Sequence, residues 1–206
     1  MRKLKILIAD DHAVVRTGLA TLLGVEKDIV IVGQARNGEE AVALAQSEHP
    51  DVVVMDLVMP KMDGAEATRK IRAHLPDCRV VILTSFGTSD DIAHALEAGA
   101  TGALMKSAED TELVDALRRI AAGERVIAPE IRQMLEDEPP VPKLTPRQKD
   151  ILASLTHGLT NRDIARQLGI REDGVNLHII AILQKLGAAN RTEAVAIALR
   201  KHLLKI

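Results

Sequence analysis

Aromatic side chains are almost absent from this chain of 206 residues, which contains one phenylalanine, Phe86, and neither tyrosine nor tryptophan. Binders of single-stranded nucleic acid stack the bases on aromatic rings, so the composition counts against that class of protein. Cysteine is equally rare. A single Cys78 cannot provide a disulfide framework or a thiolate metal cluster, which fits a reducing compartment, and we expect it to be a small core residue.

Long apolar runs are missing as well. The chain starts with basic residues, but its first apolar stretch, residues 6–9, is followed at once by two aspartates and is too short for a signal peptide. No other run approaches the length of a membrane span. We therefore expect a cytoplasmic protein that makes no membrane contact.

The net charge of −2 conceals a strong polarity along the chain. Residues 1–142 contain 16 lysines and arginines against 24 acids, whereas residues 143–206 contain 11 against 5. The change falls at an acidic stretch with three prolines at positions 139, 140 and 142, which no helix interior accommodates. We predict a first domain over residues 1–125, a helical and proline-rich linker over 126–142, and a basic domain over 143–206 that is suited to a polyanion.

The first domain alternates short apolar runs with stretches of helical periodicity, which predicts an α/β fold. Five such strands with intervening helices indicate a doubly wound parallel sheet that is covered on both faces. In sheets of this kind, ligands bind at the carboxyl ends of the strands. The predicted strands are residues 4–9, 29–34, 51–56, 79–84 and 101–105.

Five chemically active residues stand at the ends of these strands. Asp10 and Asp11 end the first strand, Asp56 the third and Thr84 the fourth, while Lys106 follows the fifth. A single acid in such a place is commonly a solvated loop residue or a helix cap, but five residues at four strand ends should gather at one edge of the sheet. The sequence therefore predicts a polar site there.

Three carboxylates at one edge repel each other, and a divalent cation such as Mg²⁺ would relieve that repulsion. The cation would also shield Asp56 from the negative charge of an incoming phosphoryl group. Asp56 could then act as a nucleophile and form an aspartyl phosphate. The Lys106 ammonium would pair with the new oxygens, and the Thr84 hydroxyl could donate to them and move the following loop.

Four segments of this domain, "IADDHAVVR", "VVVMDLVMPKMDG", "VVILTS" and "GALMK", resemble the receiver domain of two-component response regulators. The resemblance implies a flavodoxin-like five-stranded sheet, Asp56 as the phosphoacceptor and a sensor histidine kinase as the phosphoryl donor. It assigns the switch and phosphate-binding roles to Thr84 and Lys106. The Mg²⁺ ligands that it implies are the side chains of Asp10, Asp11 and Asp56 and the backbone carbonyl of Val58.

Two positions separate this domain from related proteins. Receivers usually carry an aromatic residue where this chain has Ala103, which leaves open whether the phosphorylation switch works; Phe86 could substitute, although a loop or interface position is the simpler interpretation. Phosphatases of the haloacid dehalogenase type also form an aspartyl phosphate, but they need a second acid where this chain has Val58. We therefore expect a regulator and not an enzyme.

The basic domain reads as a series of short helices with clear start and stop signals. Thr145, Pro146 and Gln148 form a capping box, Thr160 starts a second helix, and Gly169 ends it. A short helix, a tight turn and a longer helix suggest a helix-turn-helix, with a plain helical bundle as the alternative.

Along nearly its whole length this region resembles the LuxR/NarL (FixJ) type of output domain, most distinctly in "LTPRQ", "GLTNRDIARQLGI" and "KLGAANRTEAV". The resemblance implies an all-α domain whose helix from about residue 173 to 186 enters the DNA major groove. The candidate DNA contacts are Arg162, Arg171, Asn176, His178, Lys185 and Arg191. His178 could equally be buried or lie beside a phosphate.

The start of that helix departs from its family. Arg171 replaces the usual serine cap, Gly174 lowers the helix propensity and Asn176 replaces a phosphate-binding lysine. Asp173 would then cap a helix that begins about two residues late, and Ile180 adds an apolar side chain to a face that is generally polar.

We expect a phosphorylation-controlled transcriptional regulator that forms a homodimer on double-stranded promoter DNA. The alternative is a receiver-controlled protein interaction module whose altered helix-turn-helix no longer binds DNA.

Overall fold

A computed structural model describes residues 2–85, 88–140, 144–201 and 203–204. Phe86 and Pro142 lie outside these ranges. The chain divides into two compact units, Met1–Pro139 and Pro140–Ile206. Within the described ranges, every helix falls short of the length and apolar character that a membrane crossing requires.

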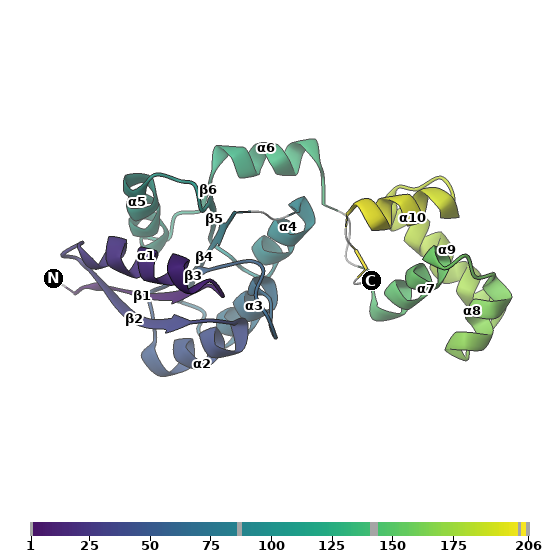
Figure 1. The fold of residues 1–206 in the computed structure, drawn as a ribbon, viewed down its shortest axis with the longest axis horizontal. Coiled ribbons are helices and arrows are strands. Elements are labelled where there is room, and N and C mark those ends of the chain that lie inside the picture. Colours follow the sequence, from purple (N-terminus) through teal and green to yellow (C-terminus); the bar gives the residue numbers. More distant parts are fainter. Residues whose placement is uncertain (1, 86–87, 141–143, 202, 205–206) are drawn as a thin grey trace. The chain divides into compact units, whose positions relative to one another are not determined.

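The first unit alternates strands and helices along the chain (Figure 1). Its elements are β1 (Leu4–Ala9), α1 (Ala13–Gly24), β2 (Ile29–Ala35), α2 (Gly38–Glu48), β3 (Val52–Met55), α3 (Gly64–His74), β4 (Arg79–Thr84), α4 (Ser89–Glu97), β5 (Gly102–Met105), α5 (Asp110–Ala121), β6 (Val126–Ile127) and α6 (Pro129–Asp137).

All strand pairs in this unit are parallel, and the strand order is β2-β1-β3-β4-β5-β6. Helices α1 and α5 cover one face of the sheet, and α2, α3 and α4 cover the other (Figure 1). The predicted doubly wound α/β fold is thus confirmed. Because all the strands run the same way, their carboxyl ends share one edge.

The sheet has one strand more than we predicted. Strand β6 pairs with β5 through Gly102 and Val126 and through Ala103 and Ile127. Two residues are too few to show a strand periodicity, so the sequence pattern could not reveal it. The pairing depends on Gly102, because a Cβ atom there would lie 2.8 Å from the Val126 carbonyl oxygen and 2.6 Å from a methyl group of Ile120.

The interior of the first unit is built from β-branched and other aliphatic side chains on the central strands. Strands β3 and β4 are buried almost throughout, as expected for strands with helices on both faces. Cys78 is buried directly before β4, which confirms it as a core residue. Residues of the expected linker also join this core: Ile131 of α6 is fully buried, and α6 packs against α4 and β5.

The second unit contains four helices within its described residues: α7 (Pro146–Thr156), α8 (Asn161–Leu168), α9 (Glu172–Leu186) and α10 (Arg191–Arg200). Thr145 and Gln148 form the predicted capping box, and Thr160 accepts a hydrogen bond from the Asp163 amide. Gly169 ends α8 with a positive φ of 64°, and α8 packs against α9. These two helices and their tight turn form the predicted helix-turn-helix.

The prediction for the N-terminus of α9 was wrong. This helix begins at Glu172, with Arg171 in extended conformation at the N-cap, and not about two residues later with Asp173 as the cap. Both acids therefore lie in the first turn, where negative charge is favourable at the positive end of the helix dipole. The Arg171 guanidinium also donates to Asp173 Oδ2 at 3.2 Å.

Candidate functional site

Four neighbouring strands bring the predicted polar residues to the carboxyl edge of the sheet. Asp10 follows β1, Asp56 follows β3, Thr84 ends β4 and Lys106 follows β5. The backbone sets these positions, since the Asp56 amide donates to the Ala9 carbonyl at 2.7 Å and the Lys106 amide donates to the Thr84 carbonyl at 2.8 Å.

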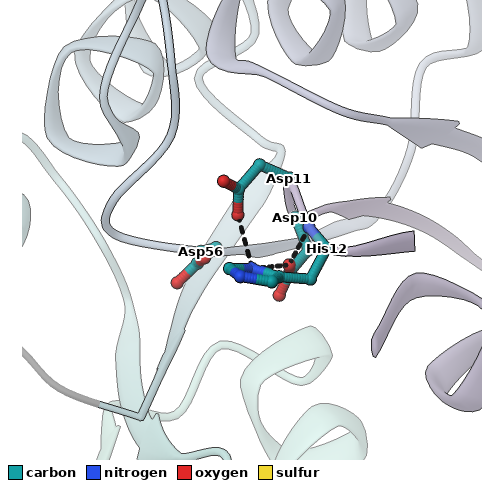
Figure 2. A group of neighbouring side chains, drawn as sticks. All are labelled: Asp10, Asp11, His12 and Asp56. Carbon is teal, nitrogen blue, oxygen red and sulfur yellow. Dashed lines mark hydrogen bonds and ion pairs between the residues drawn. The ribbon is translucent and has the colours of Figure 1, made fainter. Parts of the chain in front are cut away.

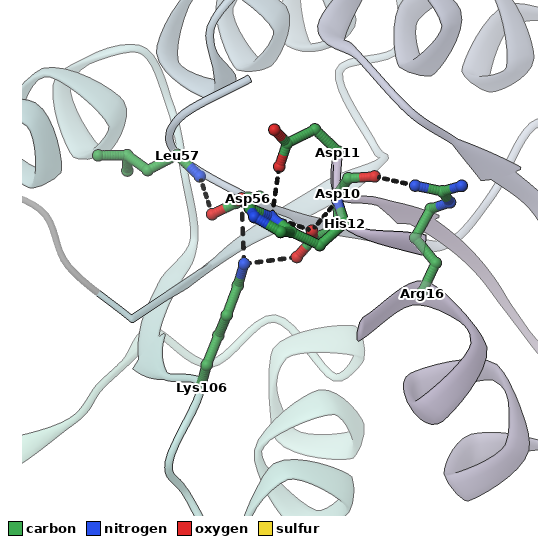
Figure 3. A network of polar contacts seen from close by, with 7 residues as sticks. All are labelled: Asp10, Asp11, His12, Arg16, Asp56, Leu57 and Lys106. Atoms are coloured by element: carbon green, nitrogen blue, oxygen red, sulfur yellow. Dashed lines mark hydrogen bonds and ion pairs between the residues drawn. The ribbon is translucent and has the colours of Figure 1, made fainter. Parts of the chain in front are cut away.

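The Lys106 side chain lies between two buried carboxylates (Figure 3). Its Nζ is 2.5 Å from Asp10 Oδ2 and 3.0 Å from Asp56 Oδ2. Asp10 is 2% exposed and Asp56 7% exposed. Two acids buried this deeply need a cationic partner, because an unpaired buried charge is strongly unfavourable. Lys106 supplies one positive charge to both.

The loop after β3 holds Oδ1 of Asp56 by a backbone hydrogen bond. The Leu57 amide donates to Asp56 Oδ1 at 2.8 Å, so Oδ2 is the oxygen that contacts Lys106. Helix α3 starts close behind this loop. A Cβ atom at Gly64 would lie 2.2 Å from the Asp56 carbonyl oxygen, so only glycine allows that approach.

Asp11 and His12 lie beside Asp10 and Asp56 at the same edge of the sheet (Figure 2). His12 Nδ1 is 2.7 Å from Asp11 Oδ1 and 3.5 Å from Asp10 Oδ1, and the His12 amide donates to Asp10 Oδ1 at 2.8 Å. The Arg16 guanidinium donates to the Asp10 carbonyl at 2.7 Å (Figure 3). The sequence pattern did not single out His12 and Arg16, although His12 directly follows the two aspartates.

The surroundings of Asp56 raise the pKa of its carboxyl group. Burial is the main cause, because it disfavours the charged form, and the negative charge of Asp10 acts in the same direction. Lys106 opposes both effects without overcoming them. For Lys106 itself, burial lowers the pKa, but the hydrogen bonds and charges of Asp10 and Asp56 outweigh it, so its pKa is raised.

The residues of this edge fit a hard divalent cation. One donor atom from each of Asp10, Asp11, His12 and Asp56 lies within 4.8 Å of the others. Carboxylate oxygens are ligands that Mg²⁺ prefers, and it commonly keeps waters as its remaining ligands. Val58 stands two residues after Asp56 with its side chain 62% exposed, in the loop that the Leu57 amide anchors.

The predicted site also includes the hydroxyl group of Thr84. Thr84 is 1% exposed, and its Oγ1 has no hydrogen-bond partner among the residues that the structure describes. A buried hydroxyl without a partner costs about 1–3 kcal/mol, so the site is arranged for a further hydrogen-bonding group. On the neighbouring strand, Ala103 is fully buried, and its methyl group occupies the position where receivers usually carry an aromatic ring.

Three of the predicted DNA contacts are exposed arginines on the second unit. Arg162 lies in the first turn of α8 with its side chain exposed. Arg171 pairs with Asp173, as described above, and the Arg191 guanidinium donates to the Leu159 carbonyl at 2.8 Å. Arg191 thus ties the start of α10 to the turn before α8.

The remaining three candidates lie on α9, and two of them contact side chains of other helices. Asn176 accepts a hydrogen bond from the side-chain amide of Asn161, so its oxygen is already engaged. Lys185 Nζ donates to Gln148 Oε1 of α7 at 2.9 Å. His178 is half-buried. The structure therefore turns Lys185 toward α7, and it ties Asn176 to the start of α8.

Two family models match the chain. The response regulator receiver domain matches residues 6–118, and the LuxR family of bacterial regulatory proteins matches residues 142–198. The first covers the acidic edge of the sheet, and the second covers the helix-turn-helix.

Curated proteins match along almost the full length. The transcriptional regulatory protein LiaR of Bacillus subtilis (strain 168) is 39% identical over 98% of this chain and 99% of its own. The nitrate/nitrite response regulator protein NarL of Escherichia coli (strain K12) is 38% identical over 92% of each chain. The crystal structure of the response regulator ChrA of a heme-sensing two-component system is 37% identical, with a TM-score of 0.60 over 99% of this chain and all of its own. This chain therefore belongs to the LuxR-family response regulators, with a receiver domain followed by a LuxR-type DNA-binding domain.

Proposed function

We propose that Asp56 accepts a phosphoryl group from a sensor histidine kinase and that this modification controls binding of the second unit to promoter DNA. The observation that carries the proposal is the contact of Lys106 with both Asp10 and Asp56, beside a Thr84 hydroxyl without a partner among the described residues. An ammonium and a hydroxyl donor at these positions are the groups that a new phosphoryl group on Asp56 would need.

The reaction uses Asp56 Oδ2 as the nucleophile, because Oδ1 accepts the Leu57 amide. A new O–P bond forms as the P–N bond of the phosphohistidine breaks, and the departing imidazole nitrogen keeps the electron pair. Lys106 then exchanges its contact with Asp56 for the phosphoryl oxygens. A lysine ammonium is charged at neutral pH, so Lys106 offsets the negative charge that the phosphoryl group adds.

Mg²⁺ would be held by the side chains of Asp10, Asp11 and Asp56 and by the Val58 carbonyl. When bound, the ion offsets the charge of the phosphoryl group as it approaches Asp56. His12 and Arg16 hold two of these ligand residues in position. His12 orients Asp11 through its 2.7 Å contact, and Arg16 holds the Asp10 backbone.

The signal leaves the site through Thr84. Its hydroxyl donates to the phosphoryl group, and the shift reaches α4, which starts five residues later. Helix α6 packs against α4 and precedes the second unit in the chain. A movement of α4 can therefore be passed to α6 and along the chain to the second unit. Because Ala103 provides no ring, this route depends on backbone and helix movement. The phosphorylated chain would form a homodimer, which suits DNA with paired half-sites.

The test is labelling of the full chain with a small-molecule phosphoryl donor and Mg²⁺, followed by intact mass analysis. We expect one acid-labile phosphate on the wild type and none on Asp56→Asn. Asp63→Asn is a matched control in the same loop, since Asp63 is the N-cap of α3 and accepts a hydrogen bond from the Glu66 amide; it should be labelled like the wild type. Full labelling of Asp56→Asn would refute the assigned site.

The DNA-binding half is tested separately by the salt dependence of binding to duplex DNA. Contacts from lysine and arginine to phosphates release counterions, so affinity should fall steeply as salt increases. An affinity that does not change with salt, or no binding at any salt concentration, would favour the protein interaction module.

A further inference from the structure

Helix α9 has two faces of different character. Its inner face packs Val175, Ile182 and Leu186 into the core of the second unit, with all three buried. Its outer ridge, at helical spacing of i, i+4 and i+7, contains Asp173, Leu177 and Ile180. Leu177 is 69% exposed and Ile180 52% exposed. The centre of the outer ridge is therefore apolar and unburied within the second unit.

Leu177 and Ile180 do not take part in the hydrophobic core of the second unit. Val175, Ile182 and Leu186 belong to its hydrophobic cluster and Ile179 packs against that cluster, whereas Leu177 and Ile180 do neither. Because exposure of large apolar side chains is unfavourable, a helix with this pattern is suited to an apolar contact outside its own fold.

Charge around the ridge indicates what that contact is. Arg171 directly precedes α9. Arg162 is next to Asn161, whose side chain donates a hydrogen bond to Asn176 of α9. Two exposed guanidinium groups therefore lie near the N-terminal end of α9. This unit also has six more basic than acidic residues, counted over positions 143–206. The exposed acids Glu172 and Asp173 also lie there, and Asp173 pairs with Arg171, so the positive charge comes from Arg162 and from the net charge of the unit. A basic unit with a narrow apolar ridge complements a polyanion that displays apolar groups in a groove.

A second copy of the chain is a poorer occupant. Stable protein interfaces bury roughly 800 Å² on each partner, and two side chains on one ridge supply a small part of that area.

Thymine is the DNA base that presents an apolar group in the major groove, its 5-methyl. We propose that Leu177 and Ile180 contact thymine 5-methyl groups and so make thymines a determinant of the target sequence. This inference rests on the proposed DNA binding. It also accounts for the engaged oxygen of Asn176, because apolar contacts then supply readout that a bidentate asparagine–adenine pair would need both amide atoms to provide.

The test uses duplexes selected from a random pool by the phosphorylated full-length chain. The same duplexes are then resynthesised with deoxyuridine in place of thymidine, which removes the methyl groups and keeps base pairing. We expect the affinity of the wild type to fall about fourfold for each thymine methyl group removed from the interface, from the transfer free energy of one methyl-sized group. The salt dependence should not change, because the phosphate contacts remain.

Leu177→Ala and Ile180→Ala are the diagnostic variants. Each should lower the affinity for thymidine duplexes and respond less than the wild type to the deoxyuridine exchange. Leu199→Ala is the matched control, since Leu199 is 44% exposed on α10 and should leave the exchange effect unchanged. Both target side chains are exposed, so we expect unchanged melting temperatures.

The outcomes separate this inference from the proposed function. Salt-dependent binding that does not respond to the deoxyuridine exchange would overturn the thymine contact and leave DNA binding intact. Variants that no longer self-associate while keeping the full exchange effect would assign the ridge to a second copy. No duplex binding at any salt concentration would overturn both proposals.

Discussion

The Lys106 amide donates a 2.8 Å hydrogen bond to the Thr84 carbonyl, so the two side chains assigned to phosphate binding are joined through their backbones. Their strands, β4 and β5, are neighbours in the sheet. The Lys106 side chain already contacts two carboxylates, whereas the Thr84 hydroxyl has no partner among the described residues. A group added to Asp56 would change both.

Mg²⁺ should stabilise the first unit. The proposed ligands come together only in the folded chain, so at a hundredfold excess over its dissociation constant Mg²⁺ should add about 2.7 kcal/mol to the free energy of unfolding. The measurement is the melting temperature with Mg²⁺ and with a chelator. Asp10→Ala combined with Asp11→Ala should abolish the shift, and Asp77→Ala, at an exposed position away from the site, should keep it. An undiminished shift in the double variant would disprove these ligands.

Removal of Lys106 should destabilise the protein in the absence of Mg²⁺. Lys106→Met leaves Asp10 and Asp56 without their shared cation, and breaking a buried pair of this kind costs about 3 kcal/mol. Denaturant unfolding in a chelator measures the loss. Adding Asp56→Asn to Lys106→Met should recover part of it, because one of the two charges is then gone; strictly additive effects would argue against the coupling.

The raised pKa of Asp56 predicts how Asp56→Asn changes stability with pH. Below the ordinary value of 3.8, the carboxyl group is protonated in both folded and unfolded chains. As pH rises through the higher folded pKa, the folded state must bury a charge, and the stability that the neutral carboxyl contributed is lost. In a chelator, Asp56→Asn should therefore be more stable than the wild type at pH 7. The difference should shrink as pH falls toward 3.8; a wild type more stable than the variant at pH 7 would contradict this.

Glycine substitutions test the sixth strand. Gly102→Ala places a methyl group 2.8 Å from the Val126 carbonyl, which should cost about 1–3 kcal/mol by forcing β6 away from β5. Gly18→Ala is the control, because its new methyl group meets nothing within 4 Å inside α1, and it should stabilise the chain by up to about 1 kcal/mol. Unfolding free energies that rank the two variants in the opposite order would exclude the β5–β6 pairing.

The sequence predicted that these polar residues gather at one edge of the sheet, because strand ends fix where a side chain lies. Asp10, Asp56, Thr84 and Lys106 each stand at or directly after the last residue of a strand, and parallel strands carry such positions to one edge. Knowing which strands alternate with helices was enough to bring these residues together.

Contacts that depend on side-chain direction were beyond the sequence pattern. Arg16 reaches the Asp10 carbonyl from α1, and Lys185 turns to Gln148 of α7, because of rotamers and helix packing that periodicity does not specify. Strand β6 was missed because it is short, and the start of α9 because two acids stabilise its first turn without a capping side chain.

The most direct test of phosphorylation control compares the affinity of the full chain for its selected duplex DNA before and after treatment with the phosphoryl donor. Coupling between two sites is typically about 5- to 150-fold, and we expect a gain within this range for the wild type and none for Asp56→Asn. Equal affinities of the treated and untreated wild type, or an equal gain in Asp56→Asn, would contradict it.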